Sequence, residues 1–245
     1  MGKIDYRSIY EENHNGWRKM TDNPGKYEAL LAGHYSDNNH FIYELIQNAE
    51  DAGAACVVFE YYDDKICFYH DGNPFDEADV IGVSSMLETT KADDAQTIGK
   101  FGMGFKSVFK YTCEPEIYTD EEAFRIKNYL LPEEIQTDWD YKYEMCKGLK
   151  YSLNGEIYVP FNQSEHLTKV VLPFQKREKT GAVHRIDGSD IVLKLKELEP
   201  EILLFLKHIK SLFWIDVSKK KYERFVLIDQ DDSNLKVCQL KGNAV

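Results

Sequence analysis

The sequence lacks the features by which membrane and secreted proteins are recognised. No apolar run approaches the roughly 18–20 residues that a membrane-spanning helix requires. The N-terminal residues Met1 to Asp5 do not show the basic-then-apolar pattern of a secretory signal. Internal repeats and low-complexity stretches are also absent. These absences predict a cytoplasmic protein that does not act at a membrane.

The sequence has few cysteines and fewer basic than acidic residues, and each of these facts argues against a class of protein. The five cysteines are odd in number and show no C-x-x-C spacing, which argues against a disulfide framework and against a zinc site. Lysine and arginine total 30 against 42 aspartate and glutamate residues, giving a net charge of −12. Because non-specific binding to nucleic acid depends on a cationic surface, we do not expect nucleic acid as a partner.

What the chain does contain is ordinary for a well-packed domain. Hydrophobic residues make up 43% and charged residues 29% of its 245 positions. This length fits one large domain spanning residues 1–245. The residues Gly242 to Val245 follow a strand-like segment without an obvious second domain, so we expect the chain to be the N-terminal part of a longer protein.

The first part of the chain predicts two helices and a hairpin. Arg18 to Leu31 indicates a helix that is interrupted by proline and glycine. A clearer helix begins at an N-cap, Ser36, and ends at Gly53, because apolar residues recur between them at helical spacing. Two β-rich runs, Ala55–Tyr62 and Ile66–Tyr69, then predict a hairpin.

The remainder predicts a sheet with few helices. From Asp76 to Ile98 the helical signals are weak, so we expect a long functional loop. Helices are predicted at 104–111 and at 200–211. Strand-like segments lie at 116–119, 123–127, 170–172, 191–195, 225–228 and 235–240. Helices followed by mixed strands favour an α+β fold, with helices on one face of a mixed, mostly antiparallel sheet.

The second predicted helix carries three polar residues suited to chemistry. Glu44 and Asn48 are four residues apart and Asp51 follows three later, so their side chains share one helix face. An amide oxygen such as that of Asn48 suits Mg²⁺, and a carboxylate such as that of Glu44 can orient water. On this segment alone, an exposed surface helix explains the polar stripe equally well.

Two further segments are typical of a nucleotide site. Asp71 ends a predicted strand, so its carboxylate can accept a hydrogen bond from an adenine amino group, although most Asp-Gly sequences are simply turns. Residues 99–104 have the spacing G-x-x-G-x-G ahead of a predicted helix, so backbone N–H groups can cradle phosphates there. A glycine-rich connector alone is weak evidence, but Lys100 and Lys106 add positive charge beside it.

In this order, the three segments resemble the N box, G1 box and G2 box of the GHKL superfamily, which includes gyrase, the ninety-kilodalton heat-shock chaperone, histidine kinases and mismatch-repair ATPases. Residues 40–52 and 99–107 are most similar to the sacsin-like and NO VEIN-like branch of the chaperone-type ATPases. The resemblance covers roughly Tyr27 to Trp214 and is strong between Tyr35 and Tyr111. It implies the Bergerat fold, a two-layer α/β sandwich that binds ATP and Mg²⁺.

Carried over residue by residue, the resemblance assigns a role to each candidate. It makes Glu44 the general base, Asn48 the Mg²⁺ ligand and Asp71 the adenine-binding carboxylate. Asp51 would lie near the adenine through water, and Thr168 would support the adenine site from the sheet. The segment 82–97 would be the lid over ATP. The phosphate loop and the start of the following helix would consist of Gly99, Lys100, Gly102, Met103, Gly104, Phe105 and Lys106.

Two details of the resemblance bear on the adenine site and on the reaction. The G1 box usually reads D-x-G-x-G, whereas here Gly72 comes one position early and residues 73–75 replace the later glycines. Histidine kinases generally lack a carboxylate four residues before the asparagine, so Glu44 favours hydrolysis.

Three functions follow from the resemblance and stay open at this point. The first is slow ATP hydrolysis that drives a conformational change in a larger, chaperone-like protein. Members of the superfamily often need a cation from a following domain and dimerisation for lid closure, so we expect weak turnover here and homodimerisation of the full-length protein. The second is a nucleotide-binding switch with negligible hydrolysis, and the third is an interaction module with a degenerate pocket. The sequence does not name the client protein.

Overall fold

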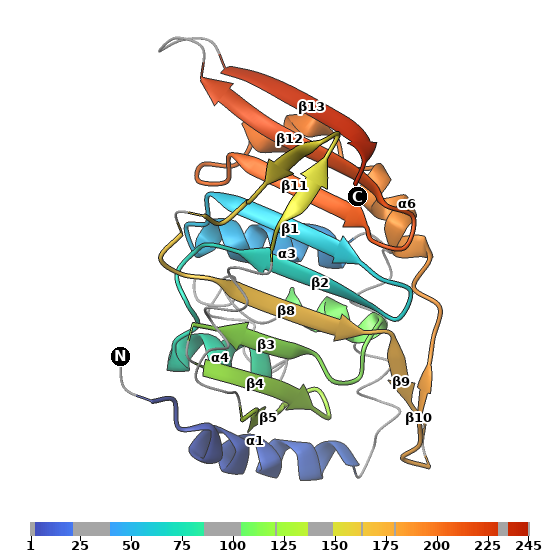
Figure 1. The fold of residues 1–245 in the computed structure, drawn as a ribbon. Coiled ribbons are helices and arrows are strands. Elements are labelled where there is room, and N and C mark those ends of the chain that lie inside the picture. Colours follow the sequence, from blue (N-terminus) through green and yellow to red (C-terminus); the bar gives the residue numbers. More distant parts are fainter. Residues whose placement is uncertain are drawn as a thin grey trace.

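The computed structural model describes residues 3–21, 40–85, 104–120, 122–136, 149–162, 164–178, 180–229 and 235–244. Its centre is one large sheet (Figure 1). The strands of that sheet are β1 (Cys56–Tyr61), β2 (Lys65–His70), β3 (Glu116–Thr119), β4 (Glu122–Lys127), β5 (Leu131–Glu134), β8 (Thr168–Pro173), β11 (Ser211–Asp216), β12 (Lys221–Asp229) and β13 (Leu235–Asn243).

The nine strands lie in the order β13-β12-β11-β1-β2-β8-β3-β4-β5. Within the described part of the chain, β1 and β11 pair in parallel and every other neighbouring pair of this sheet is antiparallel. The prediction of a mixed, mostly antiparallel sheet is therefore confirmed.

Short helices and two small ribbons complete the described structure. The helices are α1 (Tyr6–Thr21), α3 (His40–Asp51), α4 (Glu77–Ser84), α6 (Asp190–Lys196) and the 3-10 helices η1 (Phe105–Lys110) and η2 (Pro200–Leu204). The ribbons pair β6 (Tyr151–Leu153) with β7 (Glu156–Tyr158) and β9 (Gln175–Arg177) with β10 (Val183–Arg185). None of the helices that the structure describes is both long and apolar enough to cross a membrane.

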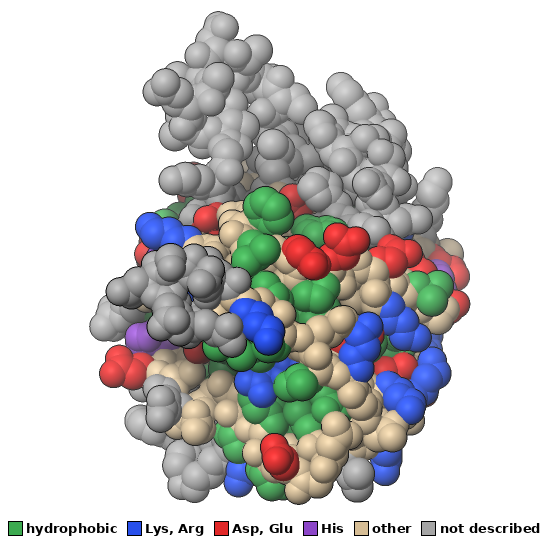
Figure 2. Space-filling view, turned by 90° about the horizontal axis from the view of Figure 1, so that it is seen from above, with side chains coloured by type: hydrophobic (Ala, Val, Ile, Leu, Met, Phe, Trp, Pro, Cys, Tyr) green, Lys and Arg blue, Asp and Glu red, His purple; other side chains and the backbone are tan. Residues whose placement is uncertain are grey.

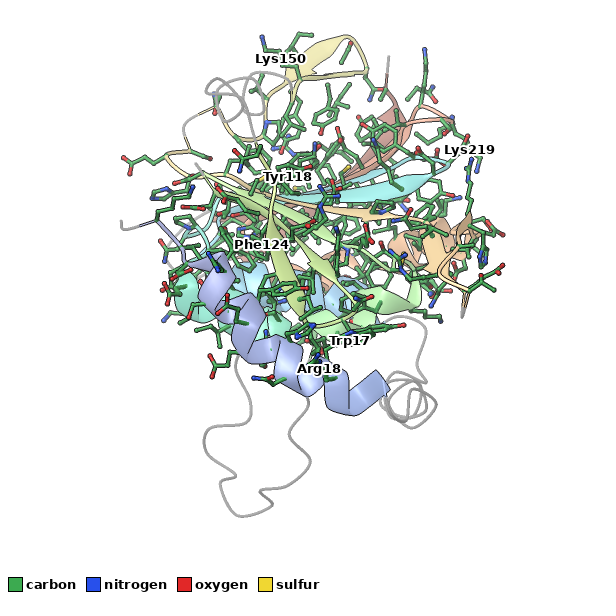
Figure 3. All side chains as sticks on the ribbon, turned by 90° about the horizontal axis from the view of Figure 1, so that it is seen from below. Trp17, Arg18, Tyr118, Phe124, Lys150 and Lys219 are labelled. Carbon is green, nitrogen blue, oxygen red and sulfur yellow. The ribbon has the colours of Figure 1, made fainter. Side chains whose placement is uncertain are left out.

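The two faces of the sheet bury separate cores, because successive side chains of a strand point to opposite faces. Val57 and Phe59 of β1 pack with residues of the helices, whereas Cys56 and Val58 pack against the chain around β6. Figure 3 views the sheet edge-on, with the β6–β7 ribbon beside Lys150 on one side and the helices on the other. The helices thus cover one face, as predicted, and the second face is covered by the β6–β7 region.

Helix α3 and the hairpin that follows it form as the sequence predicts. The apolar stripe of α3, including Phe41, Leu45 and Ala49, is buried against the sheet. Gly53 adopts a positive φ of 76° and ends the helix, since its N–H donates to the carbonyl of Glu50. The predicted N-cap Ser36 lies outside the described residues.

Several predicted elements differ from those observed. Residues 191–195, predicted as a strand, lie in helix α6. A short apolar run is compatible with both the helical and the strand period, so its sequence alone does not distinguish the two structures. In α6, Ile191 and Leu195 share the buried face, and Lys194 pairs with Asp190 one turn earlier at 2.9 Å. The helix predicted at 200–211 ends after Leu204, and Ser211 begins the central strand β11.

Two further helices extend beyond what the sequence pattern indicated. Asp76 caps α4 through a reciprocal hydrogen-bonded box with Asp79, so part of the segment predicted as a loop is helical. Helix α1 covers Tyr6–Thr21 and packs against the β5 edge of the sheet, so a helix is present well before the predicted start at Arg18. Residues 22–31 of that predicted helix lie outside the described residues. The first turn of α1 is fixed by the hydroxyl of Tyr6, which donates to Glu122 at 3.1 Å, and by contact between the rings of Tyr6 and Phe124.

Glu50, in the last turn of α3, anchors the helix to the segment before β11. Its carboxylate accepts backbone N–H groups from Lys207 at 2.6 Å, His208 at 2.8 Å and Ile209 at 3.0 Å. Desolvation opposes ionisation, but these three bonds together outweigh it and lower the pKa of Glu50 below its usual 4.5. The carboxylate therefore stabilises the folded state in its charged form.

We expect Glu50→Ala to reduce the free energy of unfolding by about 2–4 kcal/mol, because hydrogen bonds to charged groups are lost and N–H groups are left unpaired. Because the folded-state pKa lies below the unfolded one, the contribution is complete above about pH 4.5 and is lost as the pH falls through the folded pKa. Urea unfolding at neutral and acidic pH measures both effects. Glu50→Gln should remove the pH-dependent part, and a change within about 0.5 kcal/mol for Glu50→Ala would contradict the anchor.

Candidate functional site

A cavity of about 470 Å³ opens where the end of α3, the turn after β2 and helix α4 meet. This volume lies within the roughly 300–1,000 Å³ typical of small-molecule sites. Its walls come from segments that are far apart in the sequence. The lining residues are Asn48, Asp51, Ala52, His70, Asn73, Pro74, Phe75, Asp76, Asp79, Val83 and His166.

The turn after β2 is held against the C-terminal end of α3. The N–H of Asn73 donates to the carbonyl of Ala52 at 2.8 Å. A Cβ added to Gly72 would lie 2.8 Å from that same carbonyl oxygen and 2.9 Å from the Cβ of Ala52. Only glycine fits so close to the end of α3. The early glycine of this sequence therefore lets the turn close onto the helix and form one wall of the cavity.

Glu44 and Gly104 lie in direct contact, although they belong to the first and third predicted segments. A Cβ added to Gly104 would stand only 1.7 Å from Oε2 of Glu44 and 2.3 Å from its carboxyl carbon. Gly104 precedes η1, which itself packs beside α3. Asn48, one helical turn after Glu44, lines the cavity together with Asp51. The structure thus brings Gly104 against Glu44 of α3, whereas Asn48 and Asp51, and not Glu44 or Gly104, are among the described lining residues of the cavity.

Phe105 and Lys106 do not reach the cavity. Both are almost fully buried, and Phe105 belongs to the core between the helices and the sheet. The ammonium of Lys106 donates to the carbonyl of Val83 at 2.7 Å and to that of Tyr129. Burial lowers the pKa of Lys106 to about 7. Lys106 therefore links the end of α4 to Tyr129, rather than facing a phosphate as the sequence suggested.

Asp71 also faces away from the cavity. Its Oδ1 accepts the N–H groups of Ala55 and Cys56, each at 2.8 Å, and its Oδ2 accepts the hydroxyl of Ser164 at 3.1 Å. These bonds fix the start of β1 and the segment near Ser164. Their positions give no support to direct contact between Asp71 and a ligand in the cavity.

Thr168 lies in the sheet beneath this region. It is fully buried, pairs with His70 across β2 and β8, and lies 2.9 Å from the hydroxyl of Thr119 on β3. Thr119 in turn accepts the N–H of Phe75, which lines the cavity. Thr168 therefore supports the cavity wall through Thr119, and its role at an adenine site stays a prediction.

The remaining predicted residues of the phosphate loop, Gly99, Lys100, Gly102 and Met103, lie outside the described residues. The same holds for residues 86–97 of the predicted lid, whereas residues 82–84 form the last part of α4.

Several residues of the cavity were not predicted from the sequence, among them His70, Asp79 and His166. Strand alternation was the available signal for His70, because it shares its face with the buried Phe68. No comparable local pattern marks His166, whose ring nitrogen Nδ1 lies 2.7 Å from a carboxylate oxygen of Asp120. Its position follows from long-range packing.

The described part of the cavity wall is acidic. Asp51, Asp76 and Asp79 supply carboxylates, and neither lysine nor arginine occurs among the described lining residues. Burial raises the pKa of Asp79, although hydrogen bonding from the backbone of Asp76 acts in the opposite sense. An anionic ligand in this part of the cavity therefore requires an accompanying cation.

A second cavity of about 460 Å³ lies at the β12–β13 edge and contains none of the predicted residues. Three of its four lysines have partners: Lys219 lies 3.4 Å from Asp216, Lys241 lies 3.2 Å from Glu223, and Lys221 donates to Asn243. Figure 2, seen from this end of the molecule, shows lysine and arginine in separate groups with hydrophobic and neutral surface between them. The surface visible there does not form a continuous basic patch.

Gly72→Ala should reduce the free energy of unfolding by about 1–3 kcal/mol, because the added methyl group meets backbone atoms that cannot move aside. Gly53→Ala is the matched control, since Gly53 has a positive φ but no atom within 4 Å of an added Cβ. It should cost about 1 kcal/mol through backbone strain alone. Thermal unfolding of the two variants measures the difference. Equal losses would show that close packing at Gly72 is unimportant.

Comparisons with known proteins agree with the predicted branch. The profile described as the Sacsin domain matches residues 61–226. The chain is 26% identical over 194 residues to Protein NO VEIN of Arabidopsis thaliana, covering 75% of this chain and 7% of that protein. It is 24% identical over 221 residues to Sacsin of Homo sapiens, covering 76% of this chain and 5% of that protein.

Among solved structures, one described as the crystal structure of the N terminal domain of a DNA repair protein aligns at a TM-score of 0.40 and 12% identity, over 85% of this chain and 54% of that chain. The sequence relatives are many times longer than the region they share with this chain. Because the Sacsin-domain profile spans more than half of the chain, this protein belongs to the sacsin-domain family.

Proposed function

We propose that this domain binds ATP with Mg²⁺ in the cavity beside α3 and hydrolyses it slowly, as a GHKL ATPase of the Bergerat fold within a larger protein. One observation carries the proposal: the contact between Glu44 and Gly104, one helical turn from Asn48 at the cavity wall. An exposed polar stripe would leave the carboxylate in water and would not require contact with the last glycine of the triple-glycine segment. A nucleotide site uses both the carboxylate and the glycine segment, so it explains their contact.

The donor groups at the cavity suit a magnesium–nucleotide complex. The described residues contain no cluster of three or more His, Cys, Asp or Glu side chains able to hold a metal ion by themselves. Mg²⁺ typically keeps one or two protein ligands and takes others from phosphates and water. Asn48 would hold the ion through its amide oxygen. When bound, Mg²⁺ neutralises phosphate charge, which the acidic wall formed by Asp51, Asp76 and Asp79 makes necessary.

The phosphates would be bound mainly by the segment before η1. In the sequence, Gly99, Gly102 and Gly104 permit close approach of backbone N–H groups to phosphate oxygens. Lys100 is the lysine we assign to the phosphates, because the ammonium of Lys106 is already bonded to two carbonyl groups. The lid assigned to residues 82–97 would begin at the end of α4, which Lys106 fixes.

Glu44 would orient the attacking water. Its carboxylate is half-buried and adjoins Gly104, so it lies next to the proposed phosphate-binding segment. The rigid helix α3 fixes its distance from Asn48, and positioning of this kind supplies much of the catalysis in phosphoryl transfer. The carboxylate accepts the proton as water attacks the terminal phosphorus, and ADP leaves with its oxygen.

Slow turnover follows from the charges around the cavity. Fast phosphoryl transfer generally uses a further lysine or arginine to stabilise the transition state, and the described cavity wall supplies none beside the proposed Lys100. We expect the isolated chain to turn over well below the roughly 1–10³ s⁻¹ typical of enzymes. The same observation favours a nucleotide-binding switch with negligible hydrolysis as the second candidate. Ordinary enzyme rates for the isolated chain would remove both explanations.

The output of the ATP cycle is proposed from the length of the relatives. Because the chain spans only 7% and 5% of its two relatives, we propose that nucleotide binding changes the conformation of adjoining segments. Homodimerisation of the complete protein would then close the lid.

Glu44→Gln should abolish ATP turnover while leaving ATP affinity within about threefold, because the amide keeps the shape of the carboxylate but cannot act as a base. Phosphate release and calorimetry measure the two quantities. Gly104→Ala tests the same contact from the other side. Its methyl group meets the flexible end of Glu44, so turnover should fall while the fold survives. Unchanged turnover in both variants would remove Glu44 from the reaction.

Asn48→Ala should abolish the part of ATP affinity that depends on Mg²⁺ and leave the weaker metal-free binding unchanged. Titrations with ATP in the presence of Mg²⁺ and in the presence of a chelator separate the two. Gln47→Ala is the control, because Gln47 is exposed on the same helix and bonds only to Asp51 among the described residues. An Asn48→Ala variant with full Mg²⁺ dependence would show that the ion binds elsewhere.

A further inference from the structure

The residue at the end of β2 that faces the cavity is His70. Side chains alternate along a strand, so His70 shares the helix-covered face with Phe68, whose ring centroid lies 5.9 Å from that of the imidazole. Asp71, the next residue, points toward the opposite side, where its two oxygens bind Ala55, Cys56 and Ser164. A shift of one residue therefore decides which side chain meets a ligand.

His70 lies at one end of a polar strip across the sheet. It is directly paired with Thr168 on β8, which is directly paired with Thr119 on β3. The two threonine hydroxyls lie 2.9 Å apart, and Thr119 accepts the N–H of Phe75 at the cavity wall. The polar groups of this strip lie on the same face as the cavity, among otherwise apolar neighbours.

A hydrogen bond to the ring of His70 determines which ring nitrogen carries the proton. The N–H of Gly72 donates to Nδ1 at 3.2 Å, so Nδ1 has no proton and the neutral ring carries its proton on Nε2. Burial lowers the pKa of His70 to about 4, which keeps the ring neutral at physiological pH. The ring therefore offers a ligand one hydrogen-bond donor, whereas a carboxylate at the same position would offer only acceptors.

We propose that His70, rather than Asp71, contacts the base of the bound nucleotide, by donating from Nε2 to an acceptor atom of the purine edge. This inference rests on the proposed nucleotide site. A donor at this position pairs with a ring nitrogen or a carbonyl oxygen, and it cannot pair with the amino group of adenine. Recognition at this contact is therefore independent of the 6-amino group. Asp71 is a positioning residue for β1 and has no contact with the base.

The test compares ATP with purine riboside triphosphate, which keeps the ring nitrogens of adenine but lacks the 6-amino group. Calorimetry on the unmodified chain with Mg²⁺ should give dissociation constants within about threefold of each other. A loss of about tenfold or more for the analogue, together with an unchanged ATP affinity in His70→Phe, would overturn the inference, because an acceptor such as Asp51 and not the donor of His70 would then recognise the base. If neither nucleotide binds, the proposed function itself fails, so the two failures are distinguishable.

Variants at the two neighbouring positions supply the second measurement. His70→Phe keeps a ring but removes the donor, and it should weaken binding of both nucleotides by about three- to tenfold. Asp71→Asn keeps an oxygen that can accept from Ala55 and Cys56, and it should leave both affinities unchanged. His70→Asp replaces the donor by an acceptor and should create a preference for ATP over the analogue. Loss of ATP binding in Asp71→Asn with normal binding in His70→Phe would restore the role first predicted for Asp71.

Discussion

The close approach of the turn after β2 to the end of α3 is the constraint on which the site depends. Gly72 allows the two segments to approach closely, and the hydrogen bond from the N–H of Asn73 to the carbonyl of Ala52 holds them together. Through this contact, the polar face of α3 and the end of β2 contribute to the wall of one cavity. Glu50 fixes the same helix end from the other side by binding the segment before β11. The helix that carries Asn48 is therefore held at both flanks of its last turn.

The second face of the sheet contributes rigidity rather than chemistry. The carboxylate of Glu60 accepts hydroxyl groups from Tyr62, Tyr69 and Tyr151 at 2.8–3.1 Å, which ties the β6 region to the hairpin of β1 and β2. Asp71 extends this attachment by binding Ser164. Buried polar groups of this kind are stable only when each has a partner, so they specify one arrangement of the covering segment. The position of β2, and with it that of the cavity wall, depends on this arrangement.

The sequence predicted those parts of the fold that local patterns determine. The apolar stripe of α3, the glycine that ends it and the hairpin of β1 and β2 were all visible in residue spacing. The family was likewise predicted from its motifs, and the Sacsin-domain match confirms that branch. Strand β11 was missed because it is defined by pairing with β1, some 150 residues earlier in the chain, and no local signal encodes such a pairing.

The candidate site was predicted in the same uneven way. Glu44 contacts Gly104, and Asn48 lines the cavity one helical turn after Glu44, since each lies on or beside a regular element. Lys106 did not follow its motif, because a lysine stem can turn into the core when two carbonyl groups accept its ammonium. For Asp71 the strand-end motif indicated the right place in the fold but the wrong face, because it does not specify the phase of side-chain alternation. The roles assigned to residues outside the described ranges, including Gly99 and Gly102, remain predictions.

The most direct test of a nucleotide site beside α3 is an NMR titration of the isotope-labelled chain with a non-hydrolysable ATP analogue and Mg²⁺. Binding at this site predicts that the largest chemical-shift changes occur around Asn48, His70, Asn73 and Val83, which surround one cavity. Changes concentrated instead at Lys219, Lys221 and Lys241 would place the nucleotide in the β12–β13 cavity. That result, or the absence of any change, would contradict a nucleotide site between α3 and the turn after β2.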